Sequence, residues 1–275
     1  MLAPETITLP SGLFCRQWRP EGPVRRSIII VHGLGEHSGR YQALAEVFAA
    51  RGLRVVALDH PGHGESPGHR VFIKRFDDFL TGVRECRAHL AAADPEISCF
   101  ILGHSMGGLI VSRLLLEDQS QYCGALLSGP AFEAGEPPSP VLLKVVGLLA
   151  RVLPRLGVLA LDANGVSRDP KVVEAYNKDT LVNHGKVTAG LVYALLTTMG
   201  EVIERAGEIT LPLLVMHGEA DSMAAPSGSE HFVARVGSQD LSFTLLPQLY
   251  HEIFNEPEGP QIMAAFADWI DARLP

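Results

Sequence analysis

One serine in this chain lies between glycines in a pattern that suits nucleophilic chemistry. Ser105 is the centre of the pentapeptide Gly-His-Ser-Met-Gly (103–107), with the apolar run CFIL before it and the stretch MGGLIVSRLLLEDQ after it. These runs predict a buried strand, a sharp turn and a helix, with Ser105 at the turn. Side chains two residues before and two after the serine would collide with nearby backbone, so both positions require Gly. Free N–H groups at the start of the helix would favour the oxyanion formed in acyl transfer.

A serine hydroxyl attacks only when a base takes its proton, so a histidine and an acid are needed later in the chain. The stretch LPLLVMHGEADSMA predicts a buried strand and then a loop with Asp221, and LSFTLLPQLYHEIFNEP predicts a strand and then a loop with His251. Both loops open at the carboxyl edge of a parallel sheet, where the turn at Ser105 also lies. We therefore expect Asp221 to orient His251, and His251 to carry the proton from Ser105 to the leaving group.

Other side chains compete for these roles. Glu219, on the same loop as Asp221, and Asp59, after the run RVVAL, are alternative acids, although either could be a loop or helix cap. His251 is distinguished from the other ten histidines only by its loop. Three histidines of a Gly-rich loop lack the spacing of metal ligands and are expected to stabilise that turn: His60, His63 and His69. We expect neither a metal nor a cofactor.

An acyl-transfer site also needs two N–H donors for the oxyanion. The first is expected to be Met106, directly after the nucleophile. The second is expected to be Leu34, which lies between Gly33 and Gly35 in the loop HGLGEHSGRY that follows the run SIIIV.

The elements that position these residues follow an alternating order. Apolar runs bounded by Gly, Pro or Asp alternate with stretches of helical period such as RYQALAEVFAARG. This order predicts βαβ units, and hence an α/β fold with a mostly parallel sheet flanked by helices. Near the start, TITL and LFCRQW flank residues 10–12 (Pro-Ser-Gly), which predicts an antiparallel hairpin leading into the sheet.

The alternation stops between residues 131 and 200, where no strand is predicted. We expect a helical cap at 131–200, inserted after the sixth strand of a core made of residues 1–130 and 201–275. The cap begins with a Pro-rich connector, EAGEPPSP, and continues with the most apolar long stretch of the chain, VLLKVVGLLARVLPRLGVLAL. Lys144, Arg151 and Arg155 interrupt this stretch, so it does not predict a spanning helix. A helix pair packed on the sheet and a helix lying in a membrane interface both fit it.

Composition limits the classes of binding partner and the cellular compartment that we expect. The formal net charge of −8 gives no basic field for phosphate backbones, so nucleic acid is not expected as a partner. Four cysteines without a CxxC pair suit a reducing compartment, and the first residues show no secretory signal. We therefore expect a cytoplasmic protein, compatible with peripheral contact at a membrane surface. The sequence does not define its oligomeric state.

Five motifs together resemble a known family: HGLGEHSGRY, DHPGHGES, GHSMGG, HGEAD and YHEIFNE. In this order, from His32 to Glu256, they are similar to the monoacylglycerol lipase group of α/β-hydrolases, which also includes lysophospholipases. The resemblance implies the α/β-hydrolase fold, a small lipid ester as substrate, a lipophilic cap and a triad of Ser105, Asp221 and His251.

The resemblance also implies a polar pocket for the glycerol head group. Its positions here are Glu36 and Arg40, with His104 beside the nucleophile; Arg40 could instead be an ordinary surface charge. The chain departs from the family at Phe254, where a second histidine often follows the catalytic one. A lysophospholipase, a general carboxylesterase, an aminopeptidase and a non-catalytic receptor on the same fold are the alternative functions.

Overall fold

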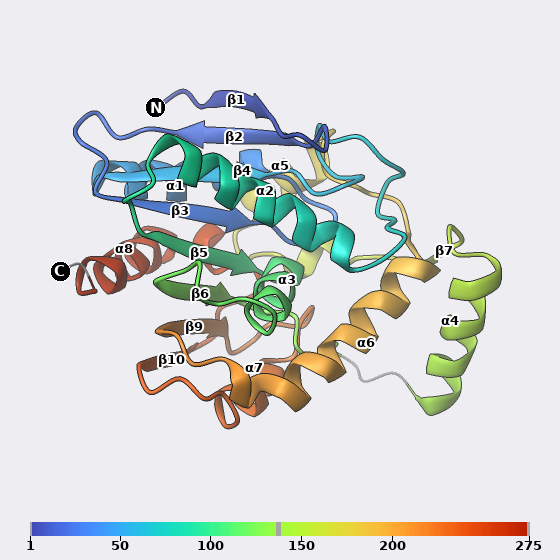
Figure 1. The fold of residues 1–275 in the computed structure, drawn as a ribbon. Helices are drawn as coiled ribbons and strands as arrows, with labels where there is room; N and C mark the ends of the chain where they lie inside the picture. Colours follow the sequence, from blue (N-terminus) through green and yellow to red (C-terminus); the bar gives the residue numbers. More distant parts are fainter. Residues whose placement is uncertain (1, 136–138, 274–275) are drawn as a thin grey trace.

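A mostly parallel sheet of eight strands forms the centre of the molecule (Figure 1). The computed structural model describes residues 2–135 and 139–273. The strands are β1 (Glu5–Thr8), β2 (Phe14–Trp18), β3 (Arg26–Val31), β4 (Leu53–Leu58), β5 (Cys99–His104), β6 (Gly124–Ser128), β9 (Leu213–Gly218) and β10 (Leu241–Leu246). Their spatial order is β1-β2-β4-β3-β5-β6-β9-β10. The pairs β1–β2 and β2–β4 are antiparallel and the others parallel, so the hairpin and the sheet type predicted from the sequence are both confirmed.

Helices cover both faces of this sheet. Five of them connect or follow its strands: α1 (Gln42–Ala50), α2 (Asp77–Ala93), α3 (Met106–Leu115), α7 (Pro226–Val233) and α8 (Gly259–Asp271). Successive side chains of β3 point to opposite faces of the sheet and so enter different cores. Ile28 and Ile30 pack with α1 and α8. Ile29 and Val31 pack with α2 and α3. Each layer is therefore a continuous apolar core, as the uninterrupted apolar runs of a doubly covered parallel sheet require.

The segment between β6 and β9 contains a second, much smaller sheet. The elements of this segment are α4 (Pro140–Val152), β7 (Gly157–Leu159), η2 (Ala163–Gly165), α5 (Pro170–Lys178), β8 (Val187–Thr188), α6 (Ala189–Arg205) and η3 (Ala206–Glu208). The expectation of no strand between 131 and 200 is wrong, since β7 and β8 pair antiparallel. Strands of three and two residues are too short to leave an alternating pattern in the sequence. The boundary expected at residue 200 falls inside α6, and residues 136–138 of the Pro-rich connector lie outside the described residues.

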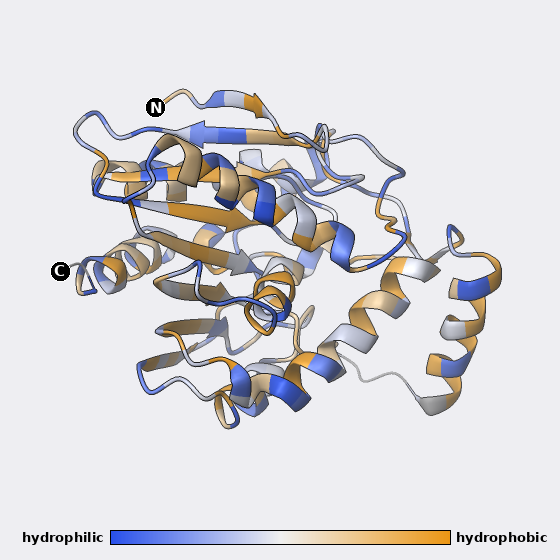
Figure 2. Cartoon of the chain, in the orientation of Figure 1, coloured by the Kyte–Doolittle hydropathy of each residue, from blue (hydrophilic) through white to orange (hydrophobic). Residues whose placement is uncertain are grey.

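The helix α4 stands out from the rest of the molecule and is apolar on its exposed side (Figure 2). Ser139 caps its first turn by accepting a hydrogen bond from the N–H of Leu142. Its described contacts are mainly with α6, and Val146 is buried. Val141 and Leu148 are 71% and 63% exposed. No helix among residues 2–135 and 139–273 is long and apolar enough to cross a membrane.

Candidate active site

Ser105 lies at the turn between β5 and α3 with the strained backbone that its motif predicts. Its φ and ψ angles are 54° and −120°, a conformation that is rare for a residue with a side chain. A Cβ atom on Gly103 would lie 2.4 Å from the carbonyl oxygen of Gly107, and one on Gly107 would lie 1.9 Å from the carbonyl oxygen of Val31. The steric reason for both glycines is therefore present in the structure.

The side chains of Ser105, His251 and Asp221 form one chain of hydrogen bonds. His251 Nε2 lies 2.8 Å from Ser105 Oγ, and His251 Nδ1 lies 2.6 Å from Asp221 Oδ2. The other oxygen of Asp221 accepts hydrogen bonds from the N–H groups of Met223 and Ala224, at 2.8 and 3.0 Å. The structure thus brings together the three residues expected from the sequence, in an order of nucleophile, base and acid that suits acyl transfer.

The competing acids lie elsewhere. Glu219 is exposed, although it is only two residues from Asp221. Asp59 is fully buried, but its carboxylate accepts hydrogen bonds from Ser38 and from the N–H of Glu65. Neither side chain has a described hydrogen bond to His251.

A second histidine, which sequence reasoning missed, contacts the acid. His217 Nε2 lies 3.0 Å from Asp221 Oδ2, while its Nδ1 lies 2.7 Å from Ser229 Oγ. The signal was the HGEAD motif, in which His217 and Asp221 are four residues apart. His217 is completely buried at the end of β9, and it contacts the same Asp221 oxygen, Oδ2, as His251 does.

Charge at the site raises the pKa of His251. Burial raises the pKa of Asp221, but His251 and His217 lower it further, so the net pKa lies below its ordinary value and the carboxylate is ionised. Burial lowers the pKa of His251, but Asp221, Glu252 and Glu36 outweigh this effect, so the net pKa is raised. These carboxylates stabilise the imidazolium that forms when His251 accepts a proton.

The expected oxyanion donors lie beside the serine. Leu34 and Met106 both line the cavity that contains Ser105 and His251. Glu36 Oε1 accepts a hydrogen bond of 2.7 Å from the N–H of Gly33, which fixes the loop just before Leu34. Met106 begins α3, so its peptide N–H belongs to the first turn of a helix.

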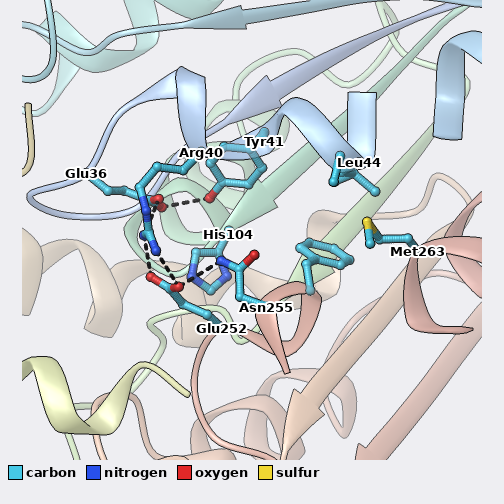
Figure 3. A pocket seen from close by; sticks show the side chains of 10 residues that line it. Glu36, Arg40, Tyr41, Leu44, His104, Glu252, Asn255 and Met263 are labelled. Atoms are coloured by element: carbon cyan, nitrogen blue, oxygen red, sulfur yellow. Dashed lines mark hydrogen bonds and ion pairs between the residues drawn. The ribbon is translucent and has the colours of Figure 1, made fainter. Parts of the chain in front are cut away.

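Arg40 is a buried charge rather than a surface one. Its side chain is 11% exposed, and it belongs to the 3₁₀-helix η1 (Ser38–Tyr41) that precedes α1. The guanidinium donates to Glu36 Oε2 at 3.1 Å and to both oxygens of Glu252 at 2.5 and 2.7 Å (Figure 3). Glu252 was not foreseen, because it is 212 residues from Arg40. Arg40 thus joins the loop that contains Glu36 to the loop that contains His251.

His104 lies directly beside the base. Its ring centroid is 4.8 Å from that of His251, and its Nδ1 is 2.9 Å from the carbonyl oxygen of Ser128. Burial and His251 lower the pKa of His104 to about 4, so the ring is neutral at pH 7. Since Nδ1 carries the proton donated to Ser128, Nε2 of His104 is a hydrogen-bond acceptor.

Two cavities meet at this site. The larger measures about 600 Å³ and combines Ser105 and His251 with a mainly apolar wall. Its apolar side chains include Leu159, Leu161, Val166, Val192, Leu195, Leu196, Met199 and Met223. The smaller, of about 20 Å³, is polar at one end, and it shares Glu36, His104 and Glu252 with the larger one. Phe254 lines it and packs edge-on against Phe266.

The parts of the chain that the structure describes contain no group of three or more His, Cys, Asp and Glu side chains that could hold a metal ion. His60 and His63 instead pack beside Phe79, at centroid distances of 5.0 and 6.3 Å. Burial lowers the pKa of His63 to about 3, so this ring stays neutral.

A serine at a strand–helix turn of a mostly parallel sheet, with histidine and aspartate on later loops, defines an α/β-hydrolase. Residues 22–258 match the model of the family described as "Serine aminopeptidase, S33", and the chain belongs to this family. Its relatives include the monoacylglycerol lipase of Mycolicibacterium smegmatis, 41% identical over 257 residues that cover 94% of this chain and 92% of that protein.

Two further comparisons agree with the resemblance to monoacylglycerol lipases. The monoglyceride lipase of Rattus norvegicus is 34% identical over 95% of this chain and 88% of its own length. The crystal structure of the Paleococcus ferrophilus monoacylglycerol lipase has a TM-score of 0.87 at 30% identity, and the match covers 95% of this chain and 99% of that one. The predicted α/β-hydrolase fold and the family resemblance are therefore confirmed.

Proposed function

We propose that this protein hydrolyses monoacylglycerols to fatty acid and glycerol through an acyl-enzyme intermediate. Ser105 Oγ attacks the ester carbonyl carbon while His251 Nε2 takes the hydroxyl proton, and Asp221 holds the resulting imidazolium. The N–H groups of Leu34 and Met106 receive the oxyanion. The C–O bond to glycerol then breaks, and His251 returns the proton to the leaving oxygen. Water, deprotonated by His251, releases the fatty acid.

The observation that carries this proposal is the hydrogen-bond chain of Ser105, His251 and Asp221 beside an apolar cavity of about 600 Å³. An apolar cavity suits a hydrocarbon chain, because burial from water stabilises each methylene by about 0.8 kcal/mol. The polar wall of Glu36 and His104 suits the glycerol hydroxyls. Relatives named as monoacylglycerol lipases support the same substrate.

Replacing the nucleophile tests the mechanism. Ser105→Ala should lower kcat for 1-octanoylglycerol by at least about 10⁴-fold, because no other group supplies the attacking oxygen. Release of octanoate is the measurement, and an unchanged melting temperature shows that the fold is intact. Ser120→Ala, at an exposed serine that bonds only to Asp118 among its described contacts, is the matched control. Turnover by the Ser105→Ala variant close to that of the wild type would refute the proposal.

The family description favours one rival activity, peptide hydrolysis at an amino terminus. The two activities are separated by comparing kcat/KM for 1-octanoylglycerol, p-nitrophenyl octanoate and a proline p-nitroanilide. We expect the octanoyl esters to be cleaved and the anilide to remain intact, because the cavity beside Ser105 has a mainly apolar wall. Preferential cleavage of the anilide would instead assign an aminopeptidase.

We also propose that residues 131–200 act as a cap whose helix α4 contacts lipid surfaces. Exposed apolar side chains on one helix are a common means of interfacial binding. Lys144 and Arg151 on α4 are suited to anionic headgroups. With this contact, the protein would be cytoplasmic and would bind peripherally at a membrane surface.

A further inference from the structure

The wall shared by the two cavities carries an unbalanced negative charge. Arg40 is the one cationic side chain among the described residues that line the smaller cavity, and it faces two carboxylates, Glu36 and Glu252. Both carboxylates are buried and Arg40 is largely so, with side-chain exposures of 4%, 6% and 11% for Glu36, Glu252 and Arg40. One positive and two negative charges leave a net charge of −1.

The remaining described partners of these carboxylates are neutral. Glu36 accepts hydrogen bonds from the Tyr41 hydroxyl and the N–H of Gly33, and Glu252 accepts one from the Asn255 amide. His104, which faces the same wall, is neutral at pH 7. None of these groups cancels the excess charge, although each helps to keep the carboxylates ionised.

Both Nη atoms of Arg40 are already paired with carboxylates. Glu252 binds the guanidinium in a bidentate manner, and Glu36 accepts from the same Nη1 atom. A phosphate that bound both Nη atoms would have to displace Glu252, and the displaced carboxylate would remain buried beside it. An arginine in a head-group pocket usually indicates an anion site. Arg40, however, is already paired with two carboxylates of the protein.

We propose that Glu252 is a specificity-determining residue, which makes the alcohol-facing wall net negative so that the enzyme accepts esters of neutral alcohols and rejects esters of anionic ones. The inference rests on the proposed function, because it takes the leaving alcohol to lie against Glu36, His104 and Glu252. It separates monoacylglycerols from lysophospholipids whose head group is a phosphomonoester.

The test compares two substrates with the same acyl chain, 1-octanoylglycerol and 1-octanoylglycerol 3-phosphate, both below their critical micelle concentrations. For the wild type, kcat/KM should be at least about 100-fold higher for the neutral ester, because buried charges interact strongly at short distance. Glu252→Gln removes one negative charge and should reduce this ratio by about tenfold or more. The ratio is measured within one enzyme, so a general loss of activity does not affect it.

Two variants separate charge from geometry. Glu252→Asp keeps the charge but shortens the side chain, and it should keep the discrimination even if overall activity falls. Glu201→Gln is the matched control, since Glu201 also pairs with two arginines, Arg113 and Arg205, but does not line either cavity. A ratio that stays unchanged in Glu252→Gln, or that falls equally in Glu252→Asp, overturns the inference.

If Glu252→Gln does not fold, the wild type alone still tests whether the enzyme discriminates against anionic alcohols. Octanoylcholine, whose alcohol is cationic, should be cleaved with a higher kcat/KM than the phosphate ester. Equal cleavage of all three esters overturns the inference and leaves the proposed function standing. A wild type that cleaves none of them overturns the proposed function itself, and with it the inference.

Discussion

Three carboxylates stabilise the protonated form of His251, and each comes from a different part of the chain. Asp221 follows β9, Glu252 is the next residue on its own loop, and Glu36 follows β3. Burial opposes a positive charge on His251, but the carboxylates outweigh it. His251 is therefore easier to protonate than an ordinary histidine, so the proposed catalysis should be sensitive to acid.

Acidification tests this balance. Only neutral His251 can take the proton of Ser105, and its raised pKa places the acid limb of the kcat/KM profile above pH 6.5, the usual histidine value. Glu252→Gln removes one carboxylate and should move this limb to lower pH. Glu201→Gln should leave it in place. A limb that moves to higher pH in Glu252→Gln would contradict the assignment of charge around the base.

The close approach at Gly107 gives a stability prediction. Gly107→Ala would place Cβ 1.9 Å from the carbonyl oxygen of Val31, which belongs to the central strand β3 and cannot move freely. We expect a loss of about 3 kcal/mol or more in the free energy of unfolding, at the upper end for overpacked cores. Gly200→Ala, in α6 with nothing within 4 Å of the new atom, should instead gain about 1 kcal/mol. Urea denaturation measures both, and equal stability of the two variants would show that the contact is relieved.

At the scale of elements, α4 begins like an ordinary helix but exposes an unusually apolar surface. Ser139 and Pro140 begin it as in many helices, yet its side chains stay largely in water. Its partner α6 covers only the face around Val146. Such a helix is stable enough to form and still has apolar surface to bury against another phase.

Charges placed on this surface test its contact with lipid. The double variant Val141→Glu and Leu148→Glu should bind phosphatidylglycerol vesicles at least about tenfold more weakly, because two exposed apolar side chains are lost from the interface. Its melting temperature should change little, since both positions are exposed. Ala92→Glu with Ala93→Glu, on exposed positions of α2, adds the same charge elsewhere. Equal loss of vesicle binding in both double variants would assign the effect to net charge alone.

At the scale of the whole molecule, the sequence predicted what depends on local pattern. The alternation of strands and helices, the turn at Ser105 and the loops of Asp221 and His251 are each visible within about twenty residues of sequence. The pair of Arg40 with Glu252 leaves none, because it forms only when the first third and the end of the chain meet. The β7–β8 pair was missed for a different reason, since so few residues cannot establish a period.

The segment that contains α4 differs in charge from the chain as a whole. Residues 139–161 contain Lys144, Arg151 and Arg155 but no acidic residue, whereas the whole chain has a formal net charge of −8. This projecting segment is therefore locally cationic in a protein whose overall charge is negative. Near an anionic bilayer, the surface potential exerts a torque on this charge distribution before any contact is made. If α4 contacts lipid as proposed, attraction between this cationic segment and an anionic surface should favour an approach with α4 toward the membrane.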